Sequence, residues 1–230
     1  MGEGLNNEAL LMPYITSCNI ACGGHAGSLE MLDAVIALAK KHNVKIGAHP
    51  SFPDRENFGR KIMKISDSKL RESLTKQLQL FRERAALSKV SVHHVKPHGA
   101  LYNLIAADQE KAALVVDAVQ QVCEKAKIYV PFKSKVEKVA LEKGVEIVYE
   151  AFADRNYHDD LSLVSRNHPK ATITIPDEAV AHVKGIVERS KVKTIEGNER
   201  EIKAQTFCVH GDNPNAFGIL KALHREFVLK

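Results

Sequence analysis

Residues 17–27 read SCNIACGGHAG, an apolar run that breaks into glycines and a histidine just before a helical pattern begins. This stretch predicts a strand that ends in a loop, because three glycines allow positive φ or a close approach of the backbone to a ligand. Ser28 is a good N-cap for the next helix, whose first-turn N–H groups and dipole favour an anion. The spacing of a nucleotide-binding P-loop is absent from the stretch. These residues alone leave a plain strand-to-helix turn and a binding loop both open.

Four further apolar runs lead into polar residues in the same way, at residues 44–48, 90–95, 145–151 and 206–209. In a parallel α/β barrel the carboxyl ends of the strands share one face, where active sites form. We therefore predict a candidate site at this face. Its five strand ends carry His25, His49, His98, Asp154 and His210.

Helical periodicity alternates with these strands. Apolar residues at positions 32, 35, 36 and 39 lie on one face of a helix, and similar patterns predict helices around 70–85 and 136–140. Asp108, Pro176 and an Asn213-Pro214 pair are expected to start three more. Further strands are expected at 128–130 and 171–175, and an appended hairpin at 192–205. The alternation predicts a parallel sheet, and the length of 230 residues predicts one barrel domain over residues 1–230.

Composition narrows the function classes. The net charge is +5, from 33 Lys and Arg against 28 Asp and Glu, without a basic run interleaved with aromatic residues, so nucleic-acid binding is not indicated. We find no signal-peptide pattern and no apolar run near the roughly 18 residues of a membrane span, which predicts a soluble, cytoplasmic protein. The four cysteines lack C-x-x-C spacing and are expected to be free thiols rather than zinc ligands.

Five strings extend these observations to nearly the whole chain. They are TSCNIACGGHAG (16–27), IGAHPSFPDRENFGR (46–60), HVKPHGALYN (94–103), EAFADRNY (150–157) and CVHGD (208–212). In these strings and their order the chain resembles the LamB/YcsF family. The resemblance implies a seven-stranded-type β/α barrel of the glycoside hydrolase/deacetylase kind. It also implies the role of the A subunit of 5-oxoprolinase. That enzyme contains subunits B and C as well, and it opens 5-oxoproline to L-glutamate while ATP is hydrolysed to ADP and phosphate.

Three departures from the family pattern bear on the site. Family members usually carry a strand and an Asn-Cys-Asp segment before Gly-Glu, whereas this sequence starts at Met1-Gly2-Glu3, so we expect the first strand and its acidic residue to be missing. Ser28 stands where an Asp is common, which keeps the N-cap and loses a candidate carboxylate. Leu161 stands where a glycine often lies, so the loop around it is expected to differ.

The family's division of labour implies that subunits B and C phosphorylate the amide oxygen with ATP and that the A subunit hydrolyses the product. The hydrolytic partner then needs a base for water, donors for the phosphate and the developing oxyanion, and an acid for the ring nitrogen. Imidazole titrates near neutral pH, and Lys96 beside His98 is a candidate phosphate contact. The candidate catalytic residues are His25, His49, Lys96, His98, Asp154 and His210. The candidate substrate-binding residues are Asn19, Gly24, Asp54, Arg55, Glu150, Arg155 and Asp212.

Other interpretations stay open for several of these residues. Asp54-Arg55 and Asp154-Arg155 fit local ion pairs that only shape loops, and Asn19 fits a purely structural role. Lys96 also fits a lysine that packs its stem at the barrel rim.

The main rival function is a stand-alone, divalent-metal-dependent deacetylase or amidohydrolase, with His25, His49 and His98 as ligands. We do not favour a metal, because the acidic residue of the first strand and an H-x-x-x-H pattern are both absent. A barrel that only organises partners would not need five polar strand ends.

Overall fold

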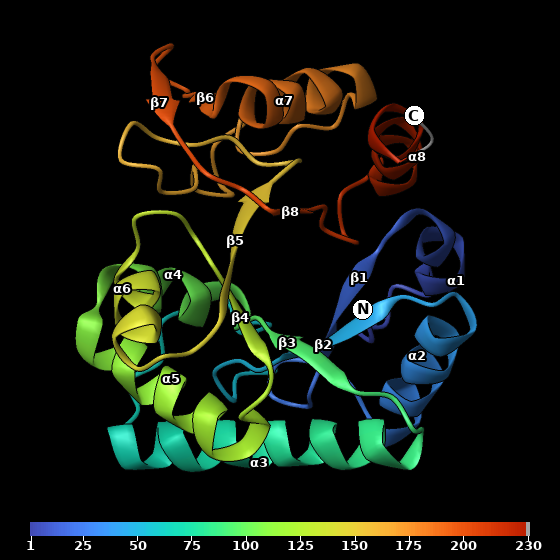
Figure 1. Cartoon of the computed structure of the whole chain (residues 1–230), viewed down its shortest axis with the longest axis vertical. Coiled ribbons are helices and arrows are strands. Elements are labelled where there is room, and N and C mark those ends of the chain that lie inside the picture. Colours follow the sequence, from blue (N-terminus) through green and yellow to red (C-terminus); the bar gives the residue numbers. More distant parts are fainter. Residues whose placement is uncertain (229–230) are drawn as a thin grey trace. The chain divides into compact units, whose positions relative to one another are not determined.

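The computed structural model describes residues 1–228 as two compact units (Figure 1). Unit 1 comprises Met1–Met12 and Thr16–Ile147, and unit 2 comprises Pro13–Ile15 and the chain from Val148 onward. The helices are α1 (Glu8–Leu11), η1 (Met12–Tyr14, a 3-10 turn), α2 (Leu29–Lys41), α3 (Asp67–Leu87), α4 (Gly99–Ala107), α5 (Gln109–Cys123), α6 (Lys135–Glu142), α7 (Pro176–Arg189) and α8 (Ala216–Phe227). The strands are β1 (Ser17–Ala21), β2 (Lys45–His49), β3 (Val92–Val95), β4 (Lys127–Val130), β5 (Ile147–Phe152), β6 (Lys191–Lys193), β7 (Glu199–Glu201) and β8 (Thr206–Cys208).

Unit 1 is built on four parallel strands in the order β1-β2-β3-β4. Their inward residues are almost fully buried, among them Ile20, Ala48 and Ile128. Helix α3 packs against α5 and α2, and Figure 1 shows α3 running beneath α5. The parallel α/β architecture predicted from the sequence is confirmed, whereas the single domain over residues 1–230 stays a prediction.

The caps predicted in unit 1 form as expected. The Ser28 hydroxyl accepts a hydrogen bond from the Met31 N–H at 3.2 Å, and the Asp108 carboxylate accepts from the first-turn N–H groups of α5. Gly144 follows α6 at φ +70°, a conformation that glycine adopts without strain. Helix α4 was missed from the sequence, because it begins directly after the polar strand end at His98 and its apolar residues read as part of the loop.

Unit 2 contains β5 paired in parallel with β8, and the predicted hairpin, which is β6-β7. Helix α7 starts at Pro176 as predicted and packs against α8. Two expectations were wrong. Residues 171–175 form only a single bridge, from Thr172 to Arg155, because their backbone bonds to the loop after β5 and not to a sheet. Helix α8 starts at Ala216. The Asn213 NH₂ group donates to a carboxylate and a carbonyl outside the helix, and its Oδ1 accepts from the N–H of Asn215, the residue just before the helix.

The outer edge of β1 carries the first residue of the chain. The Met1 amino group donates to the Asn19 carbonyl at 2.9 Å, and the Ala21 N–H donates to the Met1 carbonyl at 3.0 Å. These two bonds have the pattern of a parallel strand neighbour. They hold Gly2, at φ +69°, and Glu3 beside the carboxyl end of β1. No helix within residues 1–228 is long and apolar enough to cross a membrane.

Candidate active site

Three strand ends of unit 1 bring their histidines into contact. His25 follows β1, His49 ends β2 and His98 lies between β3 and α4. The rings of His25 and His98 stack with their centroids 3.7 Å apart, and His49 meets both edge-on at 5.7 and 4.8 Å. All three residues are at most 9% exposed. The carboxyl ends of these strands therefore place three of the predicted residues together in one buried imidazole cluster.

Backbone carbonyls fix the protons on two of these rings. Nδ1 of His49 lies 2.6 Å from the Lys96 carbonyl, and Nε2 of His98 lies 2.9 Å from the Phe58 carbonyl. A carbonyl can only accept, so both ring nitrogens must donate. The remaining two nitrogens, Nε2 of His49 and Nδ1 of His98, lie 3.0 Å apart and face each other. In the neutral rings, both of these nitrogens carry lone pairs.

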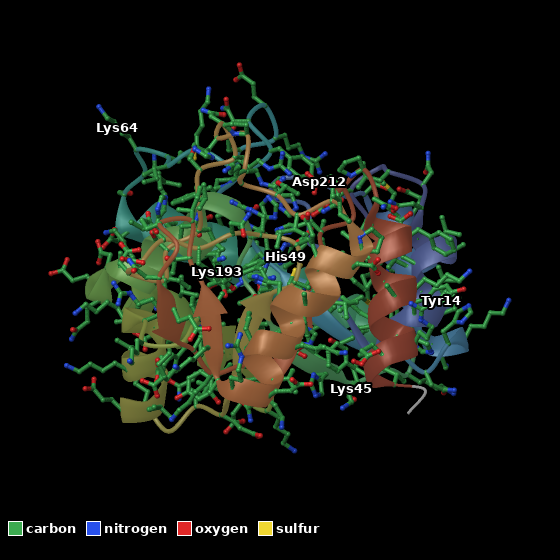
Figure 2. The ribbon with its side chains drawn as sticks, turned by 90° about the horizontal axis from the view of Figure 1, so that it is seen from above. Tyr14, Lys45, His49, Lys64, Lys193 and Asp212 are labelled. Carbon is green, nitrogen blue, oxygen red and sulfur yellow. The ribbon has the colours of Figure 1, made fainter. Side chains whose placement is uncertain are left out.

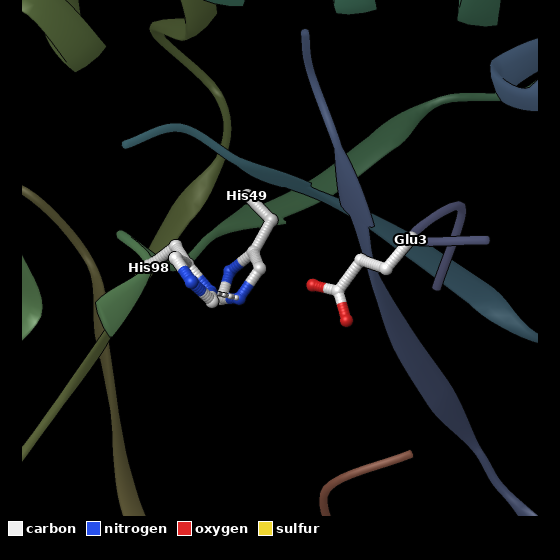
Figure 3. A group of neighbouring side chains, drawn as sticks. All are labelled: Glu3, His49 and His98. Atoms are coloured by element: carbon white, nitrogen blue, oxygen red, sulfur yellow. Dashed lines mark hydrogen bonds between the residues drawn. The ribbon is translucent and has the colours of Figure 1, made fainter. Parts of the chain in front are cut away.

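Glu3 completes the cluster, and the sequence analysis did not select it. Its carboxylate accepts a hydrogen bond from Nε2 of His25 at 3.1 Å. One oxygen of Glu3 and one nitrogen each of His49 and His98 lie within 4.8 Å of one another. Figure 3 shows the carboxylate turned toward the two rings. The acidic residue is visible in Met1-Gly2-Glu3, but nothing in that stretch indicates that Met1 pairs with β1 and so brings Glu3 to the cluster.

Burial sets the charge states in the cluster. It lowers the pKa of His49 well below the ordinary value, with the charges of His98 and His25 adding to the effect. The pKa of His98 falls to about 3 for the same first reason. Burial raises the pKa of Glu3, but the hydrogen bond from His25 and the charge of the amino terminus outweigh it and bring the pKa to about 2. The rings of His49 and His98 are therefore neutral beside an ionised Glu3 carboxylate.

Lys96 lies next to this cluster and is only 4% exposed. Its Nζ lies 5.5 Å from the ring centroid of Tyr102, and its charge contributes to the lowered pKa of His49. A lysine that packs only its stem would keep its ammonium group in water. The buried ammonium of Lys96 therefore fits the role of a phosphate contact better.

The loop between β2 and α3 covers the rings. Phe58 packs edge-on against His25 and His98, with ring centroids 5.1 and 5.4 Å away. Gly59, at φ +62°, follows directly, and a Cβ there would lie 3.0 Å from the Cβ of His25. Of the buried side-chain polar atoms in residues 1–228, Nδ1 of His25 has no hydrogen-bond partner. The loop thus shields His25 from water without supplying it with a second partner.

Asp54, Arg55 and Gly24 have structural contacts at the positions predicted for substrate binding. The Asp54 carboxylate accepts from the N–H and the amide of Asn57, and Arg55 donates to the Gly23 and Gly27 carbonyls. A Cβ on Gly24 would overlap the side chains of Gln77 and Ser51. These contacts fit the alternative in which Asp54 and Arg55 only shape the loop. Each of the two residues does so through its own hydrogen bonds.

Asn19 contacts another buried histidine, His94, which lies outside the cluster. Its Oδ1 accepts from Nε2 of His94 at 2.8 Å, and the His94 ring stacks on Tyr129 with centroids 3.8 Å apart. His94 is fully buried, and a side chain on Gly47 would overlap its ring. His93 remains partly exposed. Asn19 therefore bonds inward to His94, a contact that fits the structural role left open by the sequence.

Unit 2 brings two other predicted residues together. Asp154 is fully buried and accepts from Nδ1 of His210 at 2.9 Å, from the His210 N–H at 3.0 Å and from the Asn213 amide at 3.1 Å. Burial raises the pKa of Asp154, but these bonds outweigh it and lower the pKa below the ordinary value. Because Nδ1 donates, Nε2 of neutral His210 carries the lone pair and can take up a proton.

The remaining predicted residues of unit 2 lie around this pair. Arg155 is 5% exposed and donates to the carbonyls of Ala171 and Val164, so it ties a loop together. Asp212 accepts from Arg166 at 3.1 Å. Glu150 is buried in β5, in register with Thr206.

The sequence model of the LamB/YcsF family matches residues 1–229. The chain belongs to the LamB/YcsF family. Among similar proteins, the A subunit of 5-oxoprolinase from Histophilus somni (strain 129Pt) is 39% identical over 226 residues, covering 98% of this chain and 92% of that protein. The protein of the same name from Shouchella clausii (strain KSM-K16) is 40% identical over 222 residues, covering 96% and 88%.

A solved structure extends this family relationship to three dimensions. The lactam utilization protein from Thermus thermophilus aligns with a TM-score of 0.88 and 33% identity, covering 95% of this chain and 89% of that one. The imidazole cluster of this LamB/YcsF chain is formed by three of the strings on which the resemblance rested, those at 16–27, 46–60 and 94–103. The strings at 150–157 and 208–212 supply Asp154 and His210.

Proposed function

We propose that this chain is the hydrolytic subunit of an ATP-dependent 5-oxoprolinase that works with subunits B and C. The observation that carries the proposal is the match, over nearly the whole chain, to relatives named as the A subunit of 5-oxoprolinase. In this proposal the partner subunits use ATP to phosphorylate the amide oxygen of 5-oxoproline. This chain then hydrolyses the activated ring to L-glutamate.

The unit 1 cluster has the chemical groups that such a step needs. The buried ammonium of Lys96 is suited to hold the phosphate, since charge interactions strengthen where water is excluded. The facing nitrogens of His49 and His98 form a place for one positive charge, which would stabilise the oxyanion that develops on the substrate. Glu3 balances that charge, and its hydrogen bond from His25 holds the carboxylate in position.

Two variants test these assignments in the complete system of this chain, subunits B and C, ATP and 5-oxoproline. We expect His98→Ala and Lys96→Ala each to lower ATP-coupled hydrolysis by at least about tenfold, as the loss of a positioned acid-base or oxyanion group does. His42→Ala and Lys64→Ala are matched controls. His42 lies at the end of α2, and the exposed Lys64 side chain extends away from the ribbon in Figure 2. If folded His98→Ala or Lys96→Ala turns over substrate as fast as the control variants, the assignment of that residue to the site is wrong.

The same assay separates the proposal from a stand-alone amidohydrolase. We expect this chain without its partners to open no 5-oxoproline, with or without ATP, because its sequence lacks a phosphate-gripping P-loop. Robust ring opening by the single chain would favour the stand-alone enzyme and contradict a reaction shared between subunits.

A further inference from the structure

The two facing nitrogens of His49 and His98 have no proton between them when both rings are neutral. Each ring already donates its one neutral N–H to a carbonyl, of Lys96 and of Phe58. Two lone pairs that face each other at 3.0 Å repel, and burial removes the water that would otherwise separate them. The facing lone pairs are therefore suited to bind one positively charged species, either a third proton or a cation.

The surroundings match those of protein metal ligands. A metal-binding histidine usually donates its other ring N–H to a backbone carbonyl or a carboxylate, which fixes the tautomer and aims the lone pair. Both His49 and His98 do this, and the third candidate ligand, Glu3, is itself held by Nε2 of His25. Each of the three ligand groups thus has its own supporting hydrogen bond.

The spacing also fits. Two nitrogens that each lie about 2.0–2.1 Å from one ion are about 2.9–3.4 Å apart across the coordination angles of octahedral and tetrahedral sites. The two nitrogens here are 3.0 Å apart, and a Glu3 oxygen lies within 4.8 Å of one ring nitrogen of each histidine. The ligands come from three segments far apart in the sequence, which explains why no spacing motif announced them.

We propose that Nε2 of His49, Nδ1 of His98 and the carboxylate of Glu3 bind one divalent transition-metal ion. Two imidazoles and one carboxylate suit Zn²⁺, Co²⁺ or Fe²⁺, whereas Mg²⁺ and Ca²⁺ prefer oxygen ligands alone. Such an ion supplies Lewis-acid polarisation of a substrate oxygen. This inference departs from the sequence analysis, which did not favour a metal, and it concerns binding whether or not the chain acts on 5-oxoproline.

The test uses the full chain, freed of metal by a chelator and titrated with Co²⁺ and separately with Zn²⁺. We expect one ion per chain, a visible Co²⁺ absorption band of nitrogen and oxygen ligands, and loss of that band when Zn²⁺ displaces Co²⁺. His49→Ala, His98→Ala and Glu3→Gln should each weaken binding by at least the roughly 10–100-fold that follows loss of a supporting contact. Glu3→Asp, which keeps the carboxylate, should bind more tightly than Glu3→Gln, and His42→Ala should bind like the wild type.

Circular dichroism at each step confirms that the variants are folded. The absence of a saturable Co²⁺ band in the folded wild type, or equal affinity in folded His98→Ala and His42→Ala, would overturn the proposal and leave a shared proton between the rings. Neither readout involves ATP or 5-oxoproline. Intact metal binding without hydrolysis would contradict the proposed function alone, and hydrolysis without metal binding would contradict this inference alone.

Discussion

The Asp154 carboxylate accepts two hydrogen bonds from one residue, His210, through its backbone N–H at 3.0 Å and its ring Nδ1 at 2.9 Å. The pair therefore fixes both the position of the His210 backbone and the tautomer of its ring. This arrangement, a buried carboxylate that orients an imidazole, is used by many enzymes to prepare a general base. It also joins the end of β5 to the segment that follows β8.

We predict that Asp154→Asn lowers ATP-coupled hydrolysis by at least about tenfold, because an amide NH₂ facing Nδ1 favours the tautomer whose lone pair points inward. We also expect the free energy of unfolding to fall by about 1–3 kcal/mol, since buried donors lose their partner. Activity is measured in the complete system and stability by urea unfolding. Asp159→Asn is the matched control, because that carboxylate also accepts from three partners but lies partly exposed in the loop after β5, where it binds the hairpin. Loss of stability with full activity per folded molecule would limit Asp154 to a structural role.

A second prediction concerns His94 and pH. Burial, with the charges of His93 and Lys96, lowers the pKa of His94 well below its ordinary value of 6.5. The folded state then binds fewer protons than the unfolded state below that pH. The resulting stability is complete above pH 6.5 and is lost as pH falls toward the lowered pKa.

We expect the loss of stability on going from pH 7.5 to pH 5 to be smaller in His94→Gln than in the wild type, by up to about 2 kcal/mol. Urea unfolding at the two pH values measures it. His168→Gln, at an exposed position, is the control and should keep the wild-type dependence. An unchanged pH dependence in His94→Gln would mean that this ring does not resist protonation in the folded state.

A third prediction separates two roles for Arg55. Its Nη2 donates to the Gly27 carbonyl at 2.7 Å and to the Gly23 carbonyl at 3.2 Å. We therefore expect Arg55→Ala to speed hydrogen exchange in residues 22–27 several-fold while changing the free energy of unfolding by less than about 1 kcal/mol. Lys64→Ala, an exposed neighbour in the same loop region, should leave exchange unchanged. A raised KM with wild-type exchange would instead favour the substrate contact predicted from the sequence.

Much of the local structure was predictable because its causes are local. Ser28 and Asp108 cap their helices through their own side chains, and Pro176 fits only a first helical turn. The strand ends were predictable for a similar reason, since an apolar run that stops at a polar residue marks where a buried strand leaves the core. The sequence-based prediction was wrong where a residue with a local capping signal instead bonds a partner far away in the sequence. The Asn213 amide bonds Asp154 and the Ile173 carbonyl, and helix α8 starts two residues later than expected.

By itself, the sequence determined the parallel α/β class, the family and which strand ends carry histidine, because periodicity, caps and motif strings are properties of short segments. Only the tertiary structure decided which contacts those histidines make. Docking of Met1 along β1 brings Glu3 to the cluster, and the carbonyls of Lys96 and Phe58 select the ring tautomers. Every residue has a backbone carbonyl, so the residue types in the sequence do not indicate which carbonyl will accept a hydrogen bond from a histidine ring. The facing lone pairs of His49 and His98 arise from where the folded backbone places two oxygen atoms.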